Sequence, residues 1–477
     1  MRKRASILEK TSERQIKLSL LLGMAPMDCT RLAEQLEITK KTLLTDVLFF
    51  NHTYSPASIE IDQYQIATLS LPYDVNLEDL IKQILSQSTN VQILQAIFIE
   101  ELSLANLANK LFLSETSIRR IIANINNYFE EKNFPMTILI SAKLQITGNE
   151  DYIRQFFCSL FREQYTPQKL PHFQQIFEVL QRYYKKQRQP VSISTYKLVL
   201  NSYYLYTSII RVGQGHLAPY NSANKTGKDC LFFHLFKEHT VFCSMIEKQY
   251  HFTVTKENVH NLMTSDILFP YSITENQDSE KYQCIKNLAH HFYHCLSLDF
   301  SLSKNDLQQL SEFIHYNKNL QIFKTSYIHI LSEILMTHSP KLLNAYKEAI
   351  EQSGLIEISD NQLLYEELLL ELIALSPELL TTVFPYKKQL SILIVSYHEE
   401  HILTFYKQLL LKKLPALHTI HTYNENIFQI HYEQLNQYDL VLTDIELNQM
   451  KTSARIIKIS KIPTTAFWNN LESIIYV

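Results

Sequence analysis

Basic and hydroxyl-bearing side chains gather in two short stretches of the sequence that lie 75 residues apart. Arginine can hydrogen bond to guanine through two donors at once, and lysine or a hydroxyl group can hold a phosphate oxygen. The sequence therefore predicts contact with double-stranded DNA at both stretches. The candidate contact residues are Lys40, Lys41, Thr42, Thr45, Thr116, Ser117, Arg119 and Arg120.

A repeat with the same offset of 75 predicts the helices that must position these residues. In both copies apolar residues follow helical spacing, and Thr39 or Ser114 offers a hydroxyl as the N-cap of a second helix. Each copy therefore predicts a helix-turn-helix whose second helix can enter a DNA major groove. The matched apolar pairs are Leu32 and Leu107, Ala33 and Ala108, Leu36 and Leu111, Ile38 and Leu113, Leu43 and Ile118, Val47 and Ile122, and Phe50 and Ile125.

An ordinary helical hairpin with a solvated charged face is the alternative to each unit, and two copies in one register favour DNA binding. Alternating apolar and polar residues follow each copy, at 58–66 and at 138–146, with Gly148 closing the second segment. These segments predict β-hairpin wings, which commonly touch the sugar-phosphate backbone. We therefore expect winged helix-turn-helix modules at 1–72 and 73–150.

Composition argues against several other classes of protein. The chain has 477 residues, a net charge of -3 and only 6 glycines, and the pair Gly213 and Gly215 lacks the third glycine of a dinucleotide loop. Its six cysteines form no C-x-x-C pair and no regular spacing, which favours buried or free thiols in a reducing cytosol. His290 and His294 have a metal-ligand spacing, but packing roles are favoured. We expect a cytoplasmic protein without a membrane segment, and we predict no cofactor or metal.

The remainder of the chain divides by its hydrophobic pattern. Helical periodicity predicts two bundles at 151–278 and 279–386, joined near Asn276–Ser279, with a clear loop at Pro219–Gly227. Strands then alternate with helices in 387–477, which predicts a small parallel sheet. The expected fold is therefore mainly α, with a small α/β unit at the end. The predicted strands of that unit are 390–396, 417–423 and 438–443.

The phrases Ile146-Thr147-Gly148-Asn149-Glu150 and Ile153-Arg154-Gln155-Phe156-Phe157, together with this order of parts, resemble the Mga-type virulence regulators of Gram-positive bacteria. The resemblance covers nearly the whole chain. It implies a DNA-binding transcription activator whose two bundles are phosphotransferase-system regulation domains. It also implies histidine phosphorylation by phosphocarrier proteins of that system, and assembly as a homodimer or higher oligomer. The end of the chain resembles the enzyme IIB domain.

The resemblance also selects histidines. In related regulators an acceptor precedes the first bundle's arginine by two helical turns, but Tyr204 stands there ahead of Arg211. His216 resembles a histidine of virulence-type members, and His315 is similar to the first acceptor of the second bundle. A phosphoryl group replaces a neutral imidazole with a strong anion, which can change packing between bundles.

The chain departs from the enzyme IIB pattern where the catalytic cysteine should follow the first strand. Ser396, Tyr397 and His398 stand there, and no cysteine follows Cys295. A phosphocysteine relay is therefore not available, and we expect an interaction or oligomerisation module rather than an enzyme. An RNA-binding antiterminator with the same regulation domains is one alternative, although the two helix-turn-helix units argue against it. A phosphoryl-transfer protein is the other.

Overall fold

The chain is mainly helical, as its sequence predicts. The computed structural model describes residues 6–186, 194–218, 228–263, 280–296, 298–300, 302–317, 340–355, 358, 362–375, 390–414, 418–447 and 452–475. The expected loop at 219–227 and the join at 276–279 lie outside these residues. Among the described helices, none is both long and apolar enough to cross a membrane.

The first helix-turn-helix begins where the repeat predicts. The Thr39 hydroxyl accepts a hydrogen bond from the Thr42 amide and caps the second helix, and Asp28 caps the first in the same way. Strands β2 and β3 follow as an antiparallel pair with Ile59 opposite Leu69. The unit consists of α1 (Lys10–Met24), β1 (Met27–Asp28), α2 (Cys29–Gln35), α3 (Lys40–Thr53), β2 (Ser58–Ile61) and β3 (Ile66–Ser70).

The second unit repeats this design in the same register. The Ser114 hydroxyl accepts from the Ser117 amide, and the turns between the paired helices pass through left-handed backbone at Glu37 and Phe112, again 75 residues apart. Helix α4 (Leu77–Gln87) joins the two units. The second unit consists of α5 (Thr89–Glu100), α6 (Leu104–Leu111), α7 (Glu115–Glu131), β4 (Met136–Ile140) and β5 (Leu144–Gly148).

Each wing is attached to its recognition helix by one asparagine at the same repeat position. Asn51 and Asn126 both use the amide group twice, donating to a strand carbonyl and accepting from the amide of the same strand residue. The strand residues are Ile59 of β2 and Ile138 of β4, at 2.7–2.9 Å. Because both bonds go to backbone atoms, they fix the wing against the helix whatever the strand's own side chains.

Two groups of helices follow the second wing. Helix α10 packs against α8, α9 and α13, while α15 packs against α18 and α16 against α20. The first group is α8 (Glu150–Gln164), the short η1 (Pro167–Lys169), α9 (Phe173–Lys185), α10 (Thr195–Gly213), α11 (Lys228–Glu238), α12 (Thr240–Tyr250) and α13 (Lys256–Leu262). The second is α15 (Glu280–Cys295), α16 (Lys304–Asn317), α18 (Pro340–Ser353) and α20 (Gln362–Ala374).

The chain ends in a parallel sheet with strand order β7-β6-β8-β9. The three predicted strands are confirmed. Between β7 and β8 the chain forms only single helical turns, because Ile427, Ile430 and Leu435 fold inward onto a small core of their own. Strand β9 and helix α23 were not predicted individually. The unit consists of β6 (Ser391–Val395), α21 (Glu400–Lys413), β7 (Thr419–Thr422), η5 (Ile427–Gln429), α22 (Tyr432–Leu435), β8 (Leu440–Thr443), β9 (Arg455–Lys458) and α23 (Thr465–Ile475).

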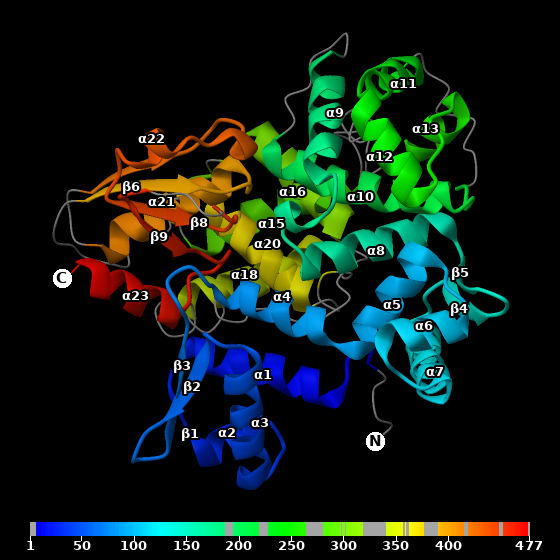
Figure 1. The fold of residues 1–477 in the computed structure, drawn as a ribbon. Coiled ribbons are helices and arrows are strands. Elements are labelled where there is room, and N and C mark those ends of the chain that lie inside the picture. Colours follow the sequence, from blue (N-terminus) through cyan, green and yellow to red (C-terminus); the bar gives the residue numbers. More distant parts are fainter. Residues whose placement is uncertain are drawn as a thin grey trace.

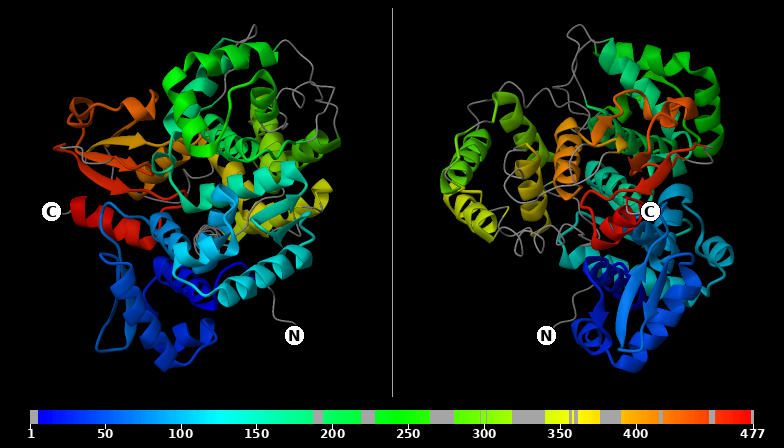
Figure 2. Two further views of the ribbon diagram at one scale, coloured as in Figure 1. Left: turned by 45° about the vertical axis from the view of Figure 1, so that its right-hand side comes forward. Right: turned by 90° about the vertical axis from the view of Figure 1, so that its left-hand side faces the viewer.

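The two ends of the chain meet. Figure 1 shows α23, in red, beside β3 and above α1, and the views in Figure 2 agree. The Asn76 side chain donates to the Ile459 carbonyl at 3.1 Å, and the Lys461 amide donates to Glu78 at 2.7 Å. Helix α20 of the second bundle also packs against α21 of the α/β unit. The α/β unit therefore contacts both the first helix-turn-helix region and the second bundle.

The asparagine that holds the second wing generates a stability prediction. Asn126→Ala removes both hydrogen bonds to Ile138 and should lower the free energy of unfolding by about 1–3 kcal/mol. Asn124→Ala is the matched control, because Asn124 is exposed on the same helix and gains the same helix propensity. It should change stability by less than about 0.5 kcal/mol. Urea denaturation measures both variants, and equal destabilisation would refute the role of Asn126.

Candidate nucleic-acid interface and its buried anchor

The outer face of α7 carries the polar residues that the sequence predicted. Thr116, Arg119 and Arg120 are all exposed, and Asn124 and Asn127 continue the same face one and two turns further on. The opposite face is buried through Ile118, Ile122 and Ile125. The fold thus presents two guanidinium groups on a helix surface with the spacing i, i+1, and no acidic residue lies between Thr116 and Asn127.

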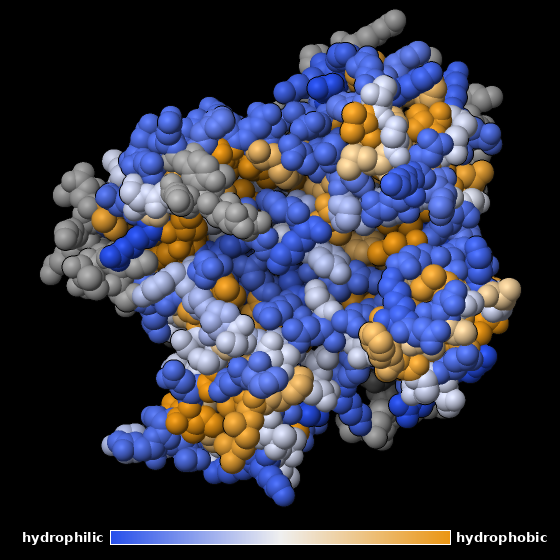
Figure 3. Space-filling model, viewed as in Figure 1, coloured by the Kyte–Doolittle hydropathy of each residue, from blue (hydrophilic) through white to orange (hydrophobic). Residues whose placement is uncertain are grey.

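The outer face of α3 has the same burial register but a different chemistry. Lys40, Lys41 and Thr45 are exposed at its start, as the sequence predicted. At the position of Arg119, however, α3 has Leu44, and the next turn exposes Leu48 to 71% and Phe49 to 44%. Figure 3 shows hydrophobic surface over the lower part of the molecule, where Figure 1 places this unit. The two recognition-type helices are therefore not equivalent surfaces.

The two remaining predicted contact residues help to build the helix starts. The Thr42 hydroxyl lies 2.9 Å from that of Thr39, and the Ser114 hydroxyl donates to Ser117 at 2.8 Å. Both Thr42 and Ser117 are only half-buried. Their amides are already capped, so any contact they make to DNA would come from the hydroxyl group.

The wings differ in charge as well. The turn of the second wing exposes Lys143, whereas the first wing turns at Asp62, whose carboxylate accepts from the amides of Tyr64 and Ile66. A cation at a wing tip suits a phosphate backbone and a carboxylate does not. The second unit therefore has the more suitable electrostatics for DNA on both its helix and its wing.

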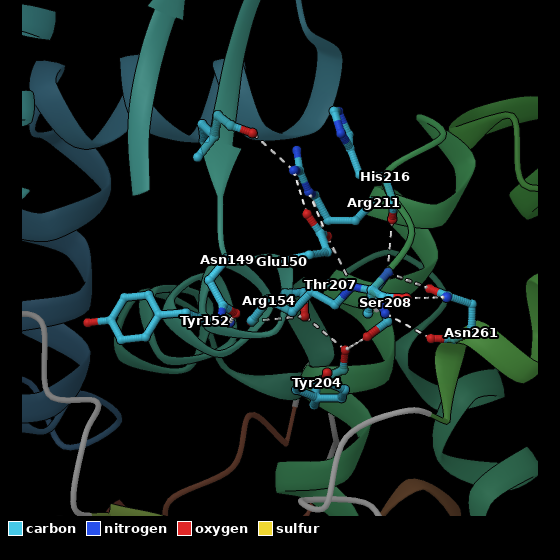
Figure 4. Close-up of polar contacts among 12 residues, drawn as sticks. Asn149, Glu150, Tyr152, Arg154, Tyr204, Thr207, Ser208, Arg211, His216 and Asn261 are labelled. Atoms are coloured by element: carbon cyan, nitrogen blue, oxygen red, sulfur yellow. Dashed lines mark hydrogen bonds and ion pairs between the residues drawn. The ribbon is translucent and has the colours of Figure 1, made fainter. Parts of the chain in front are cut away.

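A buried ion pair anchors the second unit to the first bundle (Figure 4). Arg211 of α10 is 1% exposed and donates to both oxygens of Glu150, at 3.0 and 2.7 Å. The same guanidinium donates to the carbonyl of Ile146 on strand β5 at 3.0 Å. One arginine of the bundle thus holds the wing strand and the start of α8 together.

A second arginine shares the same carboxylate. Arg154 is completely buried, and its Nε atom lies 3.0 Å from Glu150 Oε1. Its remaining donors reach the side chain and carbonyl of Asn261 at 2.7 and 2.8 Å, and the His216 carbonyl at 3.0 Å. The sequence analysis included Glu150 and Arg154 only within the family phrase, and it missed Asn261.

Gly148 allows the chain to enter this network from the wing. Its φ is +143°, and a Cβ atom there would lie 2.2 Å from the Pro135 carbonyl oxygen. Only glycine fits, so the wing can close and turn directly into α8, where Asn149 caps the helix and Glu150 follows.

His216 lies at the junction between bundle and helix-turn-helix. Its Nε2 atom is 2.5 Å from Oε1 of Glu101, the residue that ends α5 in left-handed backbone. The histidine side chain is 24% exposed and the glutamate 8%. Burial alone would raise the pKa of Glu101, but hydrogen bonds from His216 and Gln145 and the nearby charges lower it below its ordinary value. His216 is therefore a half-buried histidine that bridges to an ionised carboxylate.

The second histidine selected from the sequence is His315. It falls on α16, and its side chain lies outside the described residues. Tyr204, at the position where an acceptor histidine is absent, is buried in the middle of α10.

Of the two histidines with metal-ligand spacing, His290 makes a packing contact. The His290 ring stacks on Phe300 with centroids 3.8 Å apart, and burial lowers its pKa. His401 contacts Glu371 of α20. Within the described ranges, no three His, Cys, Asp or Glu side chains come together as a metal site.

The carboxyl edge of the parallel sheet holds a buried polar cluster. Ser396 donates to Asp444 at 2.7 Å, and His398 Nε2 lies 3.3 Å from the same carboxylate. Burial raises the pKa of Asp444 to about 7, and the neighbouring Glu78 adds to this effect. Burial, with the cations Lys461 and Lys82, holds the pKa of His398 well below its ordinary value. His398 is thus mostly buried, with its side chain 10% exposed, and is engaged by Asp444.

A helix-turn-helix with an exposed basic second helix and an adjoining wing defines a class of DNA-binding regulators. Comparison with known proteins agrees with this class. Residues 73–161 match the model of the Mga helix-turn-helix domain. The chain is also 24% identical over 300 residues to a protein of Streptococcus pneumoniae serotype 4 described as "Putative trans-acting regulator", and the match covers 61% of this chain and 59% of that protein.

Together these matches support the resemblance to the Mga-type regulator family that the sequence indicated. They support a DNA-binding transcription regulator. The matched region runs from α4 through most of α8 and so includes Glu150 and Arg154 of the buried anchor.

The raised pKa of Asp444 predicts a dependence of stability on pH. The folded protein keeps a proton on this carboxyl up to about pH 7, whereas the group's ordinary pKa is 3.8. The stability that Asp444 contributes is therefore present at low pH and lost as pH rises through about 7. Asp444→Asn should remove this loss, so its melting temperature should fall less than that of the wild type between about pH 5 and about pH 8. If the melting temperature of the two proteins fell equally with rising pH, the raised pKa of Asp444 would be disproved.

Proposed function

We propose that the chain is a transcription activator that binds double-stranded DNA mainly through α7 and the second wing. The observation that carries the proposal is the difference between the exposed faces of α3 and α7, which occupy the same position in the two repeats. Arg119 and Arg120 occupy the outward positions that Leu44 and Thr45 occupy on α3. Arginine pairs with guanine or phosphate, whereas an exposed leucine offers at most a methyl contact.

In this proposal α3 has a supporting role. Lys40 and Lys41 can hold phosphates at the start of α3, and Thr45 lies on the same exposed face. Tandem winged helix-turn-helix modules would then engage neighbouring parts of one site, with the second module supplying most of the sequence selection.

Regulation would act at His216. Transfer of a phosphoryl group from a phosphocarrier protein to this imidazole would put a new anion beside the Glu101 carboxylate. Two anions repel, and Glu101 belongs to the end of α5 in the DNA-binding unit. Phosphorylation would thus loosen the second unit from the first bundle at the contact that joins them. His315 of α16 is the second candidate acceptor, and the α/β unit is a candidate oligomerisation module with an enzyme IIB-like origin.

Paired substitutions test the DNA interface. Arg119→Ala/Arg120→Ala should weaken DNA binding by about 1–3 kcal/mol for each guanine pairing that it removes, and should reduce the salt slope for each phosphate that it releases. Lys40→Ala/Lys41→Ala should cost less and act equally on all sequences. Lys185→Ala/Lys186→Ala, which removes two exposed cations from the end of α9, is the control. Fluorescence anisotropy on promoter DNA at several salt concentrations measures all three, and unchanged binding by the arginine variant would reject the interface.

Phosphate labelling tests the regulatory step. After incubation with phosphoenolpyruvate and the general phosphotransferase proteins, we expect a labelled peptide that contains His216, and no such label in His216→Ala. His251→Ala, which removes an exposed histidine of the same bundle, should label as the wild type does. Hydrogen exchange near Glu101 should also rise on labelling, because the hydrogen bond from His216 breaks. A wild-type protein without label at His216 would exclude this acceptor.

A further inference from the structure

A polar cavity of about 630 Å³ lies where three parts of the chain meet. One wall is α4, the second is the end of α8 with the following η1, and the third is the carboxyl end of β8 with β9. Lining residues Asp79, Lys82, Gln83 and Ser86 have the spacing i, i+3, i+4 and i+7, so one continuous face of α4 is turned to the cavity. Neither the DNA interface nor the His216 contact uses this space.

The cavity is lined by three lysines and three acidic residues, and two of the lysines, Lys82 and Lys458, keep unused donors. Lys82 makes no ion pair or hydrogen bond that the structure shows within its described ranges. Lys458 is 6% exposed, lies 3.7 Å from Asp79 and donates only a 3.4 Å bond to the Asp444 carbonyl. An ammonium group has three donors, so both lysines retain unused capacity.

Two of the three acidic groups of the walls are already engaged. The Asp79 carboxylate accepts from the Asn76 amide in the capping box of α4. Glu446 pairs with Lys169 at 2.8 Å across the cavity mouth. The third acidic residue, Asp74, is exposed to solvent. An anion in the cavity would therefore pair with Lys82 and Lys458, whose donors are not used up by Asp79 and Glu446.

Two buried oxygen atoms of the second wall lack partners. Thr166 and Gln164 are each 2% exposed, and neither Thr166 Oγ1 nor Gln164 Oε1 has a hydrogen bond from the part of the chain that the structure describes. A buried polar atom without a partner is costly. Both residues line the cavity. Gln164 Oε1 can only accept, so the missing partner is a donor such as a ligand hydroxyl.

The location favours a ligand as well. In open α/β sheets, small molecules bind outside the carboxyl ends of parallel strands, which is where Thr443 and Lys458 reach this cavity. We propose that the cavity binds a small polyhydroxylated anion, with its charged group on Lys82 and Lys458 and its hydroxyl groups on Gln164 and Thr166. Such a ligand would join α4, the first bundle and the α/β unit. This proposal goes beyond DNA binding and does not depend on it.

Binding to the purified full-length chain tests the proposal without DNA. Glucose 6-phosphate supplies a phosphate on a polyol, and gluconate supplies a carboxylate. At least one should raise the melting temperature by about 2 °C or more at saturation. Calorimetric titration should give one site per chain. Glucose and inorganic phosphate, at the same concentration, should not produce the shift. The proposal is overturned if neither polyol anion shifts the melting temperature, or if inorganic phosphate alone does so equally.

Two variants and a control locate the site. Lys82→Gln removes the unpaired cation, and Thr166→Val removes the hydroxyl at constant shape, so each should weaken binding of the active anion at least tenfold. Lys248→Gln, on the exposed face of α12, should bind as the wild type does. In the wild type, the same anion should slow hydrogen exchange in α4 and in residues 164–169. Protection elsewhere without protection of these segments would overturn the site even if a variant failed to fold.

Discussion

One buried carboxylate, Glu150, holds the DNA-binding half of the molecule to the regulatory half. It pairs with two buried arginines, Arg154 and Arg211, and Glu101, 3.8 Å from Arg211, supplies the second negative charge that two buried guanidinium groups need. Other donors of the two guanidinium groups reach backbone carbonyls in β5, α13 and the segment after α10. Because a guanidinium group is planar and its donors have fixed directions, these hydrogen bonds fix the positions of the three segments relative to one another. A change of packing in the first bundle must therefore either move the second wing or break this network.

The first helix-turn-helix is held in a different way. Arg14 of α1 binds Asp46 on the inner side of α3 through two hydrogen bonds, at 2.7 and 3.0 Å. It also contacts the α/β unit, through the hydroxyl of Thr465 on the Met24 carbonyl and the Asn470 side chain on Leu71. Glu9, before α1, accepts hydrogen bonds from Ser88 and Asn90 at the start of α5, so the two units also contact each other. A change at His216 would act on the end of α5 through Glu101, whereas a change in the α/β unit would act on α1 and on the end of β3.

The local features of the fold were predictable from sequence because short-range chemistry determines them. Thr39 and Ser114 cap their helices because a hydroxyl at that spacing satisfies a free amide. Strand β9, with the residues Arg-Ile-Ile-Lys, is too short to show a period, and only its pairing with β8 makes it a strand. The contacts that matter most join distant residues: Glu101 meets His216 across 115 positions, and Asn126 meets a strand carbonyl 12 positions on. Sequence spacing identifies such residues as polar but cannot pair them, because tertiary packing decides which partners meet.

The carboxyl edge of the sheet in the α/β unit has different chemistry on its two sides. On the β6 side the edge is closed, because Ser396 and His398 both bind Asp444 and the Tyr196 ring packs near His398. Residues that would have to face solvent to accept a phosphoryl group are committed to the interior. On the β8 and β9 side the same edge borders a polar cavity with cations to spare. A sheet edge that lacks a catalytic cysteine but carries unused lysine donors can still bind a small anion. Binding here would bring together α4, α8 and the sheet. In this proposal the unit therefore serves recognition that joins α4, the first bundle and the sheet.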